Sequence, residues 1–303
     1  MLYSKHMHWS EVHVLEGTEP FALKEFVNAH GWRSLAPFHW DAGDSCLSHV
    51  RALPGGGSGA WHVTQAAPTE WRVTLQAAAP LCDSDREVLL EGVRWALRLD
   101  ESFAGFHALC RDHAPLRRAA VQGQGRLLRS PDLWEDLVKT LCTTCTTWAR
   151  TQSMVRALCD RWGELELATE RRTFPTPVAL AAAGPHELRA AGLGYRADTL
   201  YRLAERLVSG ELDPNTLRSS DISTDAVRRA LIALPGIGPY AAGNLLMLLG
   251  RYDHLAIDSW LRRVVREGWF SDRTDLTDAE IERAFQPFGS WKALVYWFWD
   301  WSR

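Results

Sequence analysis

The segment LPGIGPYAAG, Leu234 to Gly243, restricts the fold of this chain more than any other stretch. It holds three glycines and two prolines, and the sequence on either side of it has helical character. Two glycines just before a helix allow a tight turn, positive φ and several backbone N–H groups aimed at a phosphate, where the helix dipole is positive. A turn between packed helices that binds nothing would have the same local sequence. The segment therefore predicts a helical hairpin and leaves anion binding open.

The composition is that of a globular chain. With 303 residues, 46% of them hydrophobic and 23% charged, the chain is long enough for two or three domains. The formal net charge of -3 gives no general attraction to nucleic acid, so a polyanion site must be local. Two groups of arginines offer such a site: Arg117, Arg118, Arg126 and Arg129, and Arg262, Arg263 and Arg266.

Neither end of the chain has the pattern of a targeting or membrane segment. MLYSKHMHWSEV lacks the apolar run of a signal peptide, and WKALVYWFWDW is too short and too charged to span a bilayer. Six cysteines without regular spacing favour reduced thiols. We therefore expect a cytoplasmic protein without a membrane partner.

The first hundred residues differ from the rest. Trp61–Gln65 and Trp71–Leu75 are short β-prone runs around a turn at Pro68, and the glycine-rich Leu53–Ala60 is expected to be a loop between strands. Helical patterns begin at Asp83. Further helices are predicted at roughly 131–162, 175–183, 185–191, 197–209, 224–234, 241–250, 259–267, 278–285 and 291–301. The expected fold is mainly α with a small N-terminal antiparallel β-sheet domain (α+β), divided into a sheet domain of 1–99 and a helical body of 100–303.

One carboxylate follows the hairpin in the sequence, at the start of a predicted helix. Asp258 comes directly after two apolar residues and at the start of a predicted helix, about twenty residues beyond the glycines. An aspartate in that place can be a simple N-cap. Glycine hairpin, helix and aspartate in this order nevertheless resemble the helix-hairpin-helix (HhH-GPD) DNA glycosylase superfamily, in which the aspartate is the catalytic carboxylate.

The resemblance covers most of the chain. LCTTCTTWARTQSMVRALCDRWG (141–163) is similar to the helix after the strand-separating wedge of that family, and GLGYRADTLYRLAERL (192–207) to its Gly-Tyr-Arg-Ala segment. HGWRSLAPFHWD (30–41) is similar to a stretch in the alkylpurine (3-methyladenine DNA glycosylase II) and 8-oxoguanine branches. The family fold places the helical body in two lobes, one of six helices that carries the hairpin and one completed by the C-terminal helices.

The resemblance implies an enzyme that acts as a monomer on double-stranded DNA. The target nucleotide is flipped out of the duplex, and a carboxylate, here Asp258, stabilises the positive charge that develops on the sugar and orients water. The main-chain N–H groups of the hairpin would hold a backbone phosphate, and its carbonyls could hold Na⁺ or K⁺. The hairpin residues are Leu234, Pro235, Gly236, Ile237, Gly238 and Pro239.

One departure from the family bears on the mechanism. Bifunctional members carry a Schiff-base lysine two residues after the second hairpin glycine, where this chain has Tyr240. Tyrosine cannot form an imine, and Lys292, the nearest lysine towards the C-terminus, is expected to be a surface residue. The sequence therefore predicts a monofunctional glycosylase without lyase activity.

The expected base pocket is aromatic. Its predicted members are Tyr240, Asn244, Trp260, Ala293 and Trp297. Ala293 stands where the 8-oxoguanine branch has a polar reader of the base, and three aromatic rings suit an electron-poor alkylated purine. Most of the 15 tryptophans must nevertheless lie in the core. A different modified base, 8-oxoguanine or a bulky modified cytosine as in phage DNA, remains the alternative, and a catalytically silent DNA-binding module is disfavoured because Asp258 is present.

The remaining site predictions concern the wedge and cofactors. Thr144, Cys145 and Thr146 are the candidates for the wedge, and Arg196 for the wedge or a DNA backbone contact. Cys142 and Cys145 form half of a metal or redox motif whose other half is missing, and the C-terminal cysteines of iron–sulfur glycosylases are absent. No side-chain metal site and no cofactor are expected.

Overall fold

The computed structural model describes residues 8–302. The chain forms two compact units, each made of two separate stretches of sequence. Unit 1 combines the chain up to Asp100 with Leu128–Leu212, and unit 2 combines Glu101–Leu127 with the chain from Asp213 onward. These units do not coincide with the predicted domains 1–99 and 100–303, because Leu128–Leu212 groups with the sheet.

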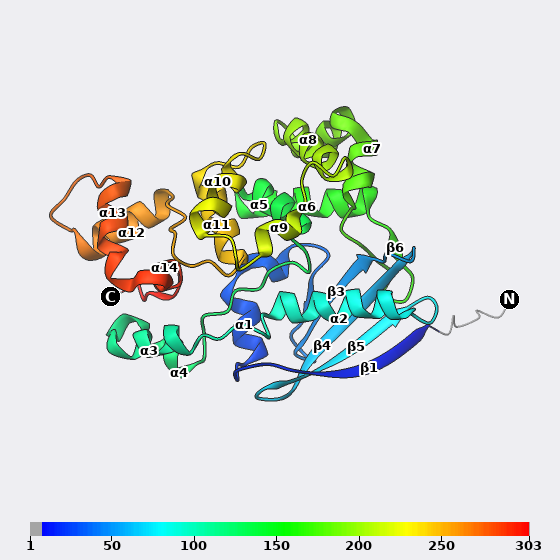
Figure 1. Ribbon diagram of the computed structural model, residues 1–303, viewed down its shortest axis with the longest axis horizontal. Helices are drawn as coiled ribbons and strands as arrows, with labels where there is room; N and C mark the ends of the chain where they lie inside the picture. Colours follow the sequence, from blue (N-terminus) through cyan, green and yellow to red (C-terminus); the bar gives the residue numbers. More distant parts are fainter. Residues whose placement is uncertain (1–7, 303) are drawn as a thin grey trace. The chain divides into compact units, whose positions relative to one another are not determined.

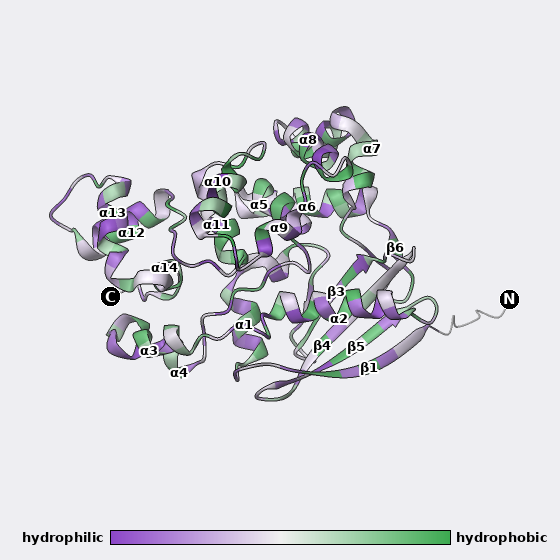
Figure 2. Cartoon of the chain, in the orientation of Figure 1, coloured by the Kyte–Doolittle hydropathy of each residue, from purple (hydrophilic) through white to green (hydrophobic). Residues whose placement is uncertain are grey.

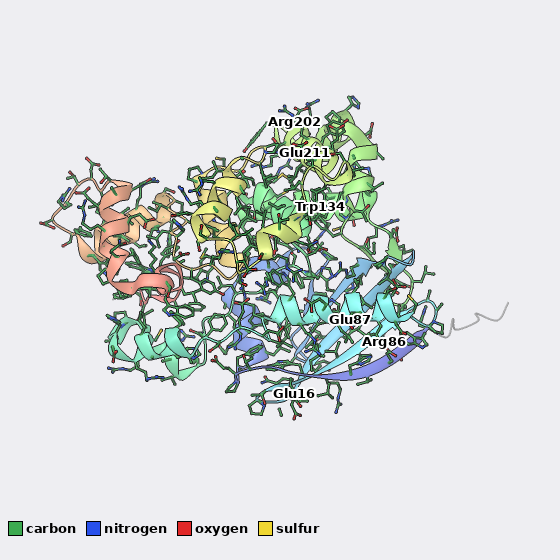
Figure 3. The ribbon with its side chains drawn as sticks, in the orientation of Figure 1. Glu16, Arg86, Glu87, Trp134, Arg202 and Glu211 are labelled. Atoms are coloured by element: carbon green, nitrogen blue, oxygen red, sulfur yellow. The ribbon has the colours of Figure 1, made fainter. Side chains whose placement is uncertain are left out.

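Unit 1 contains a five-stranded antiparallel sheet, which confirms the small sheet expected near the N-terminus. The strand order is β1-β5-β4-β3-β2, and α2 lies across one face (Figure 1). Arg86 on α2, labelled in Figure 3, donates a 2.6 Å hydrogen bond to Glu11 of β1. The strands are β1 (Trp9–Glu16), β2 (His39–Asp41), β3 (Cys46–Ala52), β4 (Ser58–Ala67) and β5 (Glu70–Ala77).

The glycine-rich loop is shorter than predicted. Ser58–Ala60 belong to β4, so the expectation of a loop through Ala60 was wrong for these residues. Gly59 pairs with both neighbouring strands, and a Cβ built there would lie 3.1 Å from Leu89 of α2. Here glycine allows the helix to approach the sheet closely rather than giving the backbone freedom.

Helix α5 packs against α6 and α8 in unit 1, and its residues Leu133 to Cys142 are all buried. Trp134, labelled in Figure 3, donates from its indole nitrogen to Pro175 O at 2.9 Å. The helical and minor elements of the unit are α1 (Leu23–Ala29), η1 (Gly31–Ser34), α2 (Asp83–Leu97), α5 (Leu133–Thr143), α6 (Trp148–Trp162), β6 (Leu165–Glu166), β7 (Arg171–Arg172), α7 (Pro177–Leu188), η3 (Arg189–Leu193) and α8 (Arg196–Val208).

The single helix predicted over 131–162 is two helices. The chain leaves the helical conformation between α5 and α6, where Cys145 has φ +47° and Thr147 caps α6 by accepting the Arg150 N–H. Threonine at an N-cap position starts a new helix because its hydroxyl accepts a backbone N–H that would otherwise have no partner. The turn Thr144–Thr147 therefore divides the predicted helix.

Unit 2 is helical and has an aromatic core, in which the Trp269 ring lies 4.7 Å from that of Phe285 and 5.0 Å from that of Trp299. Its elements are α3 (Ala104–Asp112), η2 (Ala114–Leu116), α4 (Arg117–Val121), α9 (Pro214–Arg218), α10 (Thr224–Ile232), α11 (Pro239–Leu248), α12 (Ser259–Trp269), α13 (Asp278–Phe285), η4 (Gln286–Trp291) and α14 (Lys292–Phe298). Figure 2 shows α11 as largely hydrophobic and α12 as rich in hydrophilic residues. Over residues 8–302, every helix is too short or too polar to cross a membrane.

Candidate active site

The predicted hairpin joins α10 to α11 inside unit 2. Gly236 has φ +72°, which glycine adopts at little cost, and the Ile237 N–H donates to Leu234 O at 3.2 Å to close the turn. Leu234 and Ile237 are buried and anchor the turn, while Gly236, Gly238 and Pro239 are exposed. The local fold therefore presents the backbone around Gly238 to solvent.

Gly238 is the N-cap of α11 and has ordinary extended torsions, φ −90° and ψ 179°. Within the described residues, no hydrogen-bond partner is found for its N–H or for the N–H of Gly236. A Cβ built on Gly238 would have no atom within 4 Å. Exposed backbone donors at the positive end of a helix are suited to an anion.

The third glycine of the segment serves packing. A Cβ built on Gly243 would lie 2.8 Å from Ala256 Cα and 3.0 Å from Leu255 O. The backbone of residues 255–256 therefore runs directly against α11, two residues before Asp258 begins the next helix. This close approach fixes the place of Asp258 relative to the hairpin helix.

Asp258 is half-buried and is the N-cap of α12. Its Oδ1 accepts the Leu261 N–H at 2.8 Å. The capping alternative considered for this residue is therefore present in the structure. Capping uses one oxygen, and across residues 8–302 Oδ2 accepts no hydrogen bond, so this oxygen remains available to a ligand.

Two tyrosines share the environment of this carboxylate. Burial and the nearby Asp258 charge raise the pKa of Tyr240, although a hydrogen bond from Asn244 acts in the opposite direction. Burial, the Asp258 carboxylate and Tyr240 raise the pKa of Tyr296 far above its usual range. Both phenols therefore stay protonated and neutral near Asp258.

Tyr296 is the residue that sequence reasoning missed. It is 6% exposed, and its ring lies 5.7 Å from the predicted pocket residue Trp260 at an interplanar angle of 56°. The Trp297 ring stands nearly perpendicular to it at 6.3 Å and is half-buried. A run of aromatic residues in the C-terminal sequence was a signal, but it did not distinguish Tyr296 from its neighbours.

The other predicted pocket residues are placed differently. Trp260 is 42% exposed. Asn244 is half-buried, and its Nδ2 donates to Tyr240 O at 3.0 Å, one turn back on α11. Ala293 is fully buried and its N–H donates to Tyr252 O at 2.9 Å, so it belongs to the core of unit 2.

Lys292 was expected at the surface, and this was wrong. Its side chain is only 12% exposed, and Nζ lies 2.9 Å from Glu282 Oε2. An ammonium held in an ion pair is a poor nucleophile because it must first lose its partner and its proton.

The wedge candidates lie in unit 1. Thr144 and Thr146 are half-buried, and Cys145 at the tip of the turn is exposed. Arg196, expected to form the wedge or to contact the DNA backbone, is 7% exposed and donates from Nε to Leu141 O at 3.0 Å and from Nη2 to Thr144 O. The structure therefore brings Arg196 together with the turn through backbone carbonyls.

The predicted arginine clusters are not uniform surfaces. Arg126 and Arg129 are 2% and 3% exposed. Arg262 and Arg263 are both exposed, and Arg262 makes two 2.9 Å hydrogen bonds to Asp278. Among residues 8–302, no group of three His, Cys, Asp or Glu side chains could hold a metal.

The sequence of the hairpin region matches a known family. The model of the "HhH-GPD superfamily base excision DNA repair protein" matches residues 138–289, which is half of the chain and includes the hairpin and Asp258. This chain belongs to the HhH-GPD superfamily. The membership confirms the predicted fold.

The proteins that this chain is similar to carry different names. The chain is 26% identical over 164 residues to an N-glycosylase/DNA lyase of Saccharomyces cerevisiae (50% of this chain, 44% of that protein). It is 29% identical over 189 residues to DNA-3-methyladenine glycosylase 2 of Escherichia coli (60% of this chain, 63% of that protein). The 3-methyladenine DNA glycosylase of Archaeoglobus fulgidus has a similar fold, with a TM-score of 0.76 and 18% identity over 94% of this chain and 97% of that one.

Proposed function

We propose that this HhH-GPD protein is a monofunctional DNA glycosylase that flips a modified base out of duplex DNA and hydrolyses its N-glycosidic bond. The observation that carries the proposal is the Asp258 carboxylate, which lies beside two neutral phenols and whose Oδ2 accepts no hydrogen bond from the part of the chain that the structure describes. Cleavage of the N-glycosidic bond builds positive charge on the sugar. A fixed carboxylate in a partly buried site stabilises that charge and orients the attacking water.

The absence of a lyase step is part of the proposal. Tyr240 stands where bifunctional relatives carry their lysine, and Lys292 is engaged with Glu282. Neither side chain can readily supply an amine to the sugar. Borohydride should therefore trap no covalent complex with substrate DNA, and the product should be an intact abasic strand until alkali is added.

The hairpin is proposed to hold the DNA backbone. The exposed N–H groups around Gly238 would donate to a phosphate oxygen, and their position at the start of α11 adds the helix dipole. A monovalent cation at the hairpin carbonyls is compatible with this geometry because a carbonyl has two lone pairs, so Leu234 O can accept the Ile237 N–H and still face a cation. The turn Thr144–Thr146, with its exposed tip at Cys145, is the proposed wedge.

For the substrate we propose an alkylated purine. The rings of Trp260 and Tyr296, whose centroids lie 5.7 Å from each other, favour stacking on an electron-poor base. Asn244 already donates to Tyr240 O, which reduces its capacity to read a polar base edge. Another modified base, such as 8-oxoguanine, is the second candidate, because a solved structure with a similar fold (TM-score 0.74, 15% identity) is named an 8-oxoguanine glycosylase/lyase of Clostridium acetobutylicum.

The test is base release from duplexes that contain alkylated, oxidised or hypermodified bases. Asp258→Asn should lower single-turnover release by orders of magnitude and leave duplex affinity unchanged or higher, because a negative charge near phosphates is removed. Asparagine also caps helices well, so α12 should remain folded. Asp213→Asn is the matched control, since Asp213 caps α9 by accepting the Asn215 N–H. Near-normal release by Asp258→Asn would refute the catalytic role.

A further inference from the structure

The C-terminal end of α5 is bound by an arginine from a distant part of unit 1. The last carbonyls of a helix have no partner within the helix and interact well with a cation. Arg196 supplies that cation: Nε donates to Leu141 O, within the last turn of α5, and Nη2 donates to Thr144 O, in the turn that follows. The guanidinium thus spans the helix end and the start of the turn from a buried position.

The turn needs such support. Cys145 has φ +47°, a conformation that residues other than glycine adopt only when their surroundings hold them there. The buried Thr151 hydroxyl of α6 also donates to the end of α5, to Cys142 O at 2.9 Å. Two buried side chains, Arg196 and Thr151, therefore hold the backbone that precedes the exposed tip at Cys145.

A second arginine joins the same two segments. Arg150, in the first turn of α6, donates from Nη2 to Gly192 O at 2.5 Å. The Arg196 guanidinium also packs on the ring of Tyr195, with Cζ 4.5 Å from the ring centroid. Two arginines therefore link the α5–α6 region to the η3–α8 region, and Arg196 is the buried one.

We infer that Arg196 is a positioning residue, which acts on DNA through the turn Thr144–Thr146 and not by touching it. The inference rests on the proposed function, in which this turn occupies the space left by a flipped nucleotide. With Nε and Nη2 bonded to carbonyls and the group 7% exposed, Arg196 is poorly placed to bind a phosphate. Its fixed planar fork reaches two carbonyls at once, which a lysine ammonium on a flexible stem does not reproduce.

The first measurement concerns the turn itself. Arg196→Lys should speed hydrogen exchange of the amides at residues 144–147, because one of the two ties to α5 is lost. Arg189→Lys is the control, since Arg189 is an exposed arginine of the neighbouring segment that pairs with Asp198. Unchanged exchange in a folded Arg196→Lys protein would overturn the inference. This result does not depend on catalysis.

The second measurement separates positioning from a general loss of structure. Single-turnover release is compared on two duplexes with the same target base, one normally paired and one with the target opposite an abasic site, where extrusion costs less. Arg196→Lys should slow release from the paired target about ten-fold and from the unpaired target by less than about two-fold. Equal losses on both duplexes would mean a merely structural role and would overturn the inference.

A second variant and a second readout complete the test. If Arg196→Lys does not fold, Thr151→Val removes the other tie to α5 with little change in volume and should show the same preference for the unpaired target. If the wild-type protein releases no base, the proposed function fails. Fluorescence of 2-aminopurine in bound duplex then reports unstacking without catalysis, and equal signals from wild type and Arg196→Lys would overturn the inference as well.

Discussion

Gly243→Ala tests whether α11 sets the position of Asp258. The added Cβ would lie 2.8 Å from Ala256 Cα and 3.0 Å from Leu255 O, and backbone atoms cannot move aside as a flexible side chain can. Overpacking of this kind costs about 1–3 kcal/mol. Replacing glycine by alanine inside a helix returns about 1 kcal/mol. The net loss in the free energy of unfolding should therefore be up to about 2 kcal/mol.

The assay is denaturant unfolding together with base release by the fraction that remains folded. Gly268→Ala is the matched control, because Gly268 lies on α12 in the same unit and the atoms nearest to an added Cβ are at 3.4 Å, an ordinary contact. It should leave stability unchanged or raise it by up to about 1 kcal/mol. Folded Gly243→Ala should also release base more slowly, because the segment before Asp258 must shift. Wild-type stability and release in Gly243→Ala would refute the reasoning.

Three other outcomes are expected. Gly238→Ala should fold normally, because the position has ordinary torsions and open space, but its methyl group should obstruct the approach of a phosphate. Binding to damaged and undamaged duplex should weaken by about 1–3 kcal/mol, and the salt dependence of binding should flatten by about one phosphate. An unchanged salt slope would contradict the contact between hairpin and phosphate. Tyr296→Phe should slow base release by about three- to ten-fold without changing affinity for DNA, as expected if its hydroxyl donates one hydrogen bond during the reaction, and a wild-type rate would exclude a role of the hydroxyl. Burial raises the pKa of Asp136 from 3.8 to about 6. Between these pH values the native state therefore binds one more proton than the unfolded state. As pH rises from 4 to 6, the free energy of unfolding of the wild type should fall by about 2–3 kcal/mol relative to that of Asp136→Asn. A constant difference between the two proteins across that range would contradict the shift.

The hairpin was predictable from sequence because each constraint on it is local. Gly236 permits a positive φ, and Pro239, three residues later, favours the start of a helix. The role of Gly243 was not predictable, since the backbone it contacts is supplied by Ala256. Local sequence reports torsions, whereas a close approach depends on another segment.

The strand β1 shows the same limit. Its residues alternate in burial, but the inward face includes Glu11 and His13 as well as Leu15, so apolar and polar residues do not alternate in the usual way. Glu11 is tolerated there because Arg86 and His13 bond to it. Tyr296 escaped prediction for a related reason: in an almost wholly aromatic run, the face of α14 that meets Trp260 is fixed only by packing.

The interleaved order of the two units in the sequence affects how this chain folds while it is being synthesised. The segment Glu101–Leu127 is made early, but partners of its side chains and backbone, such as Trp291 for Phe106 and Asp300 for Pro115, are made last. Domains generally fold as units during synthesis, starting from the N-terminus. Unit 1 can close once Leu212 has appeared, whereas the early piece of unit 2 must wait with Phe103 and Phe106 uncovered. Because each unit is made of two separate stretches, no single cut in the chain releases either unit whole. A cut within Leu128–Leu212 would divide unit 1 but leave both stretches of unit 2 intact.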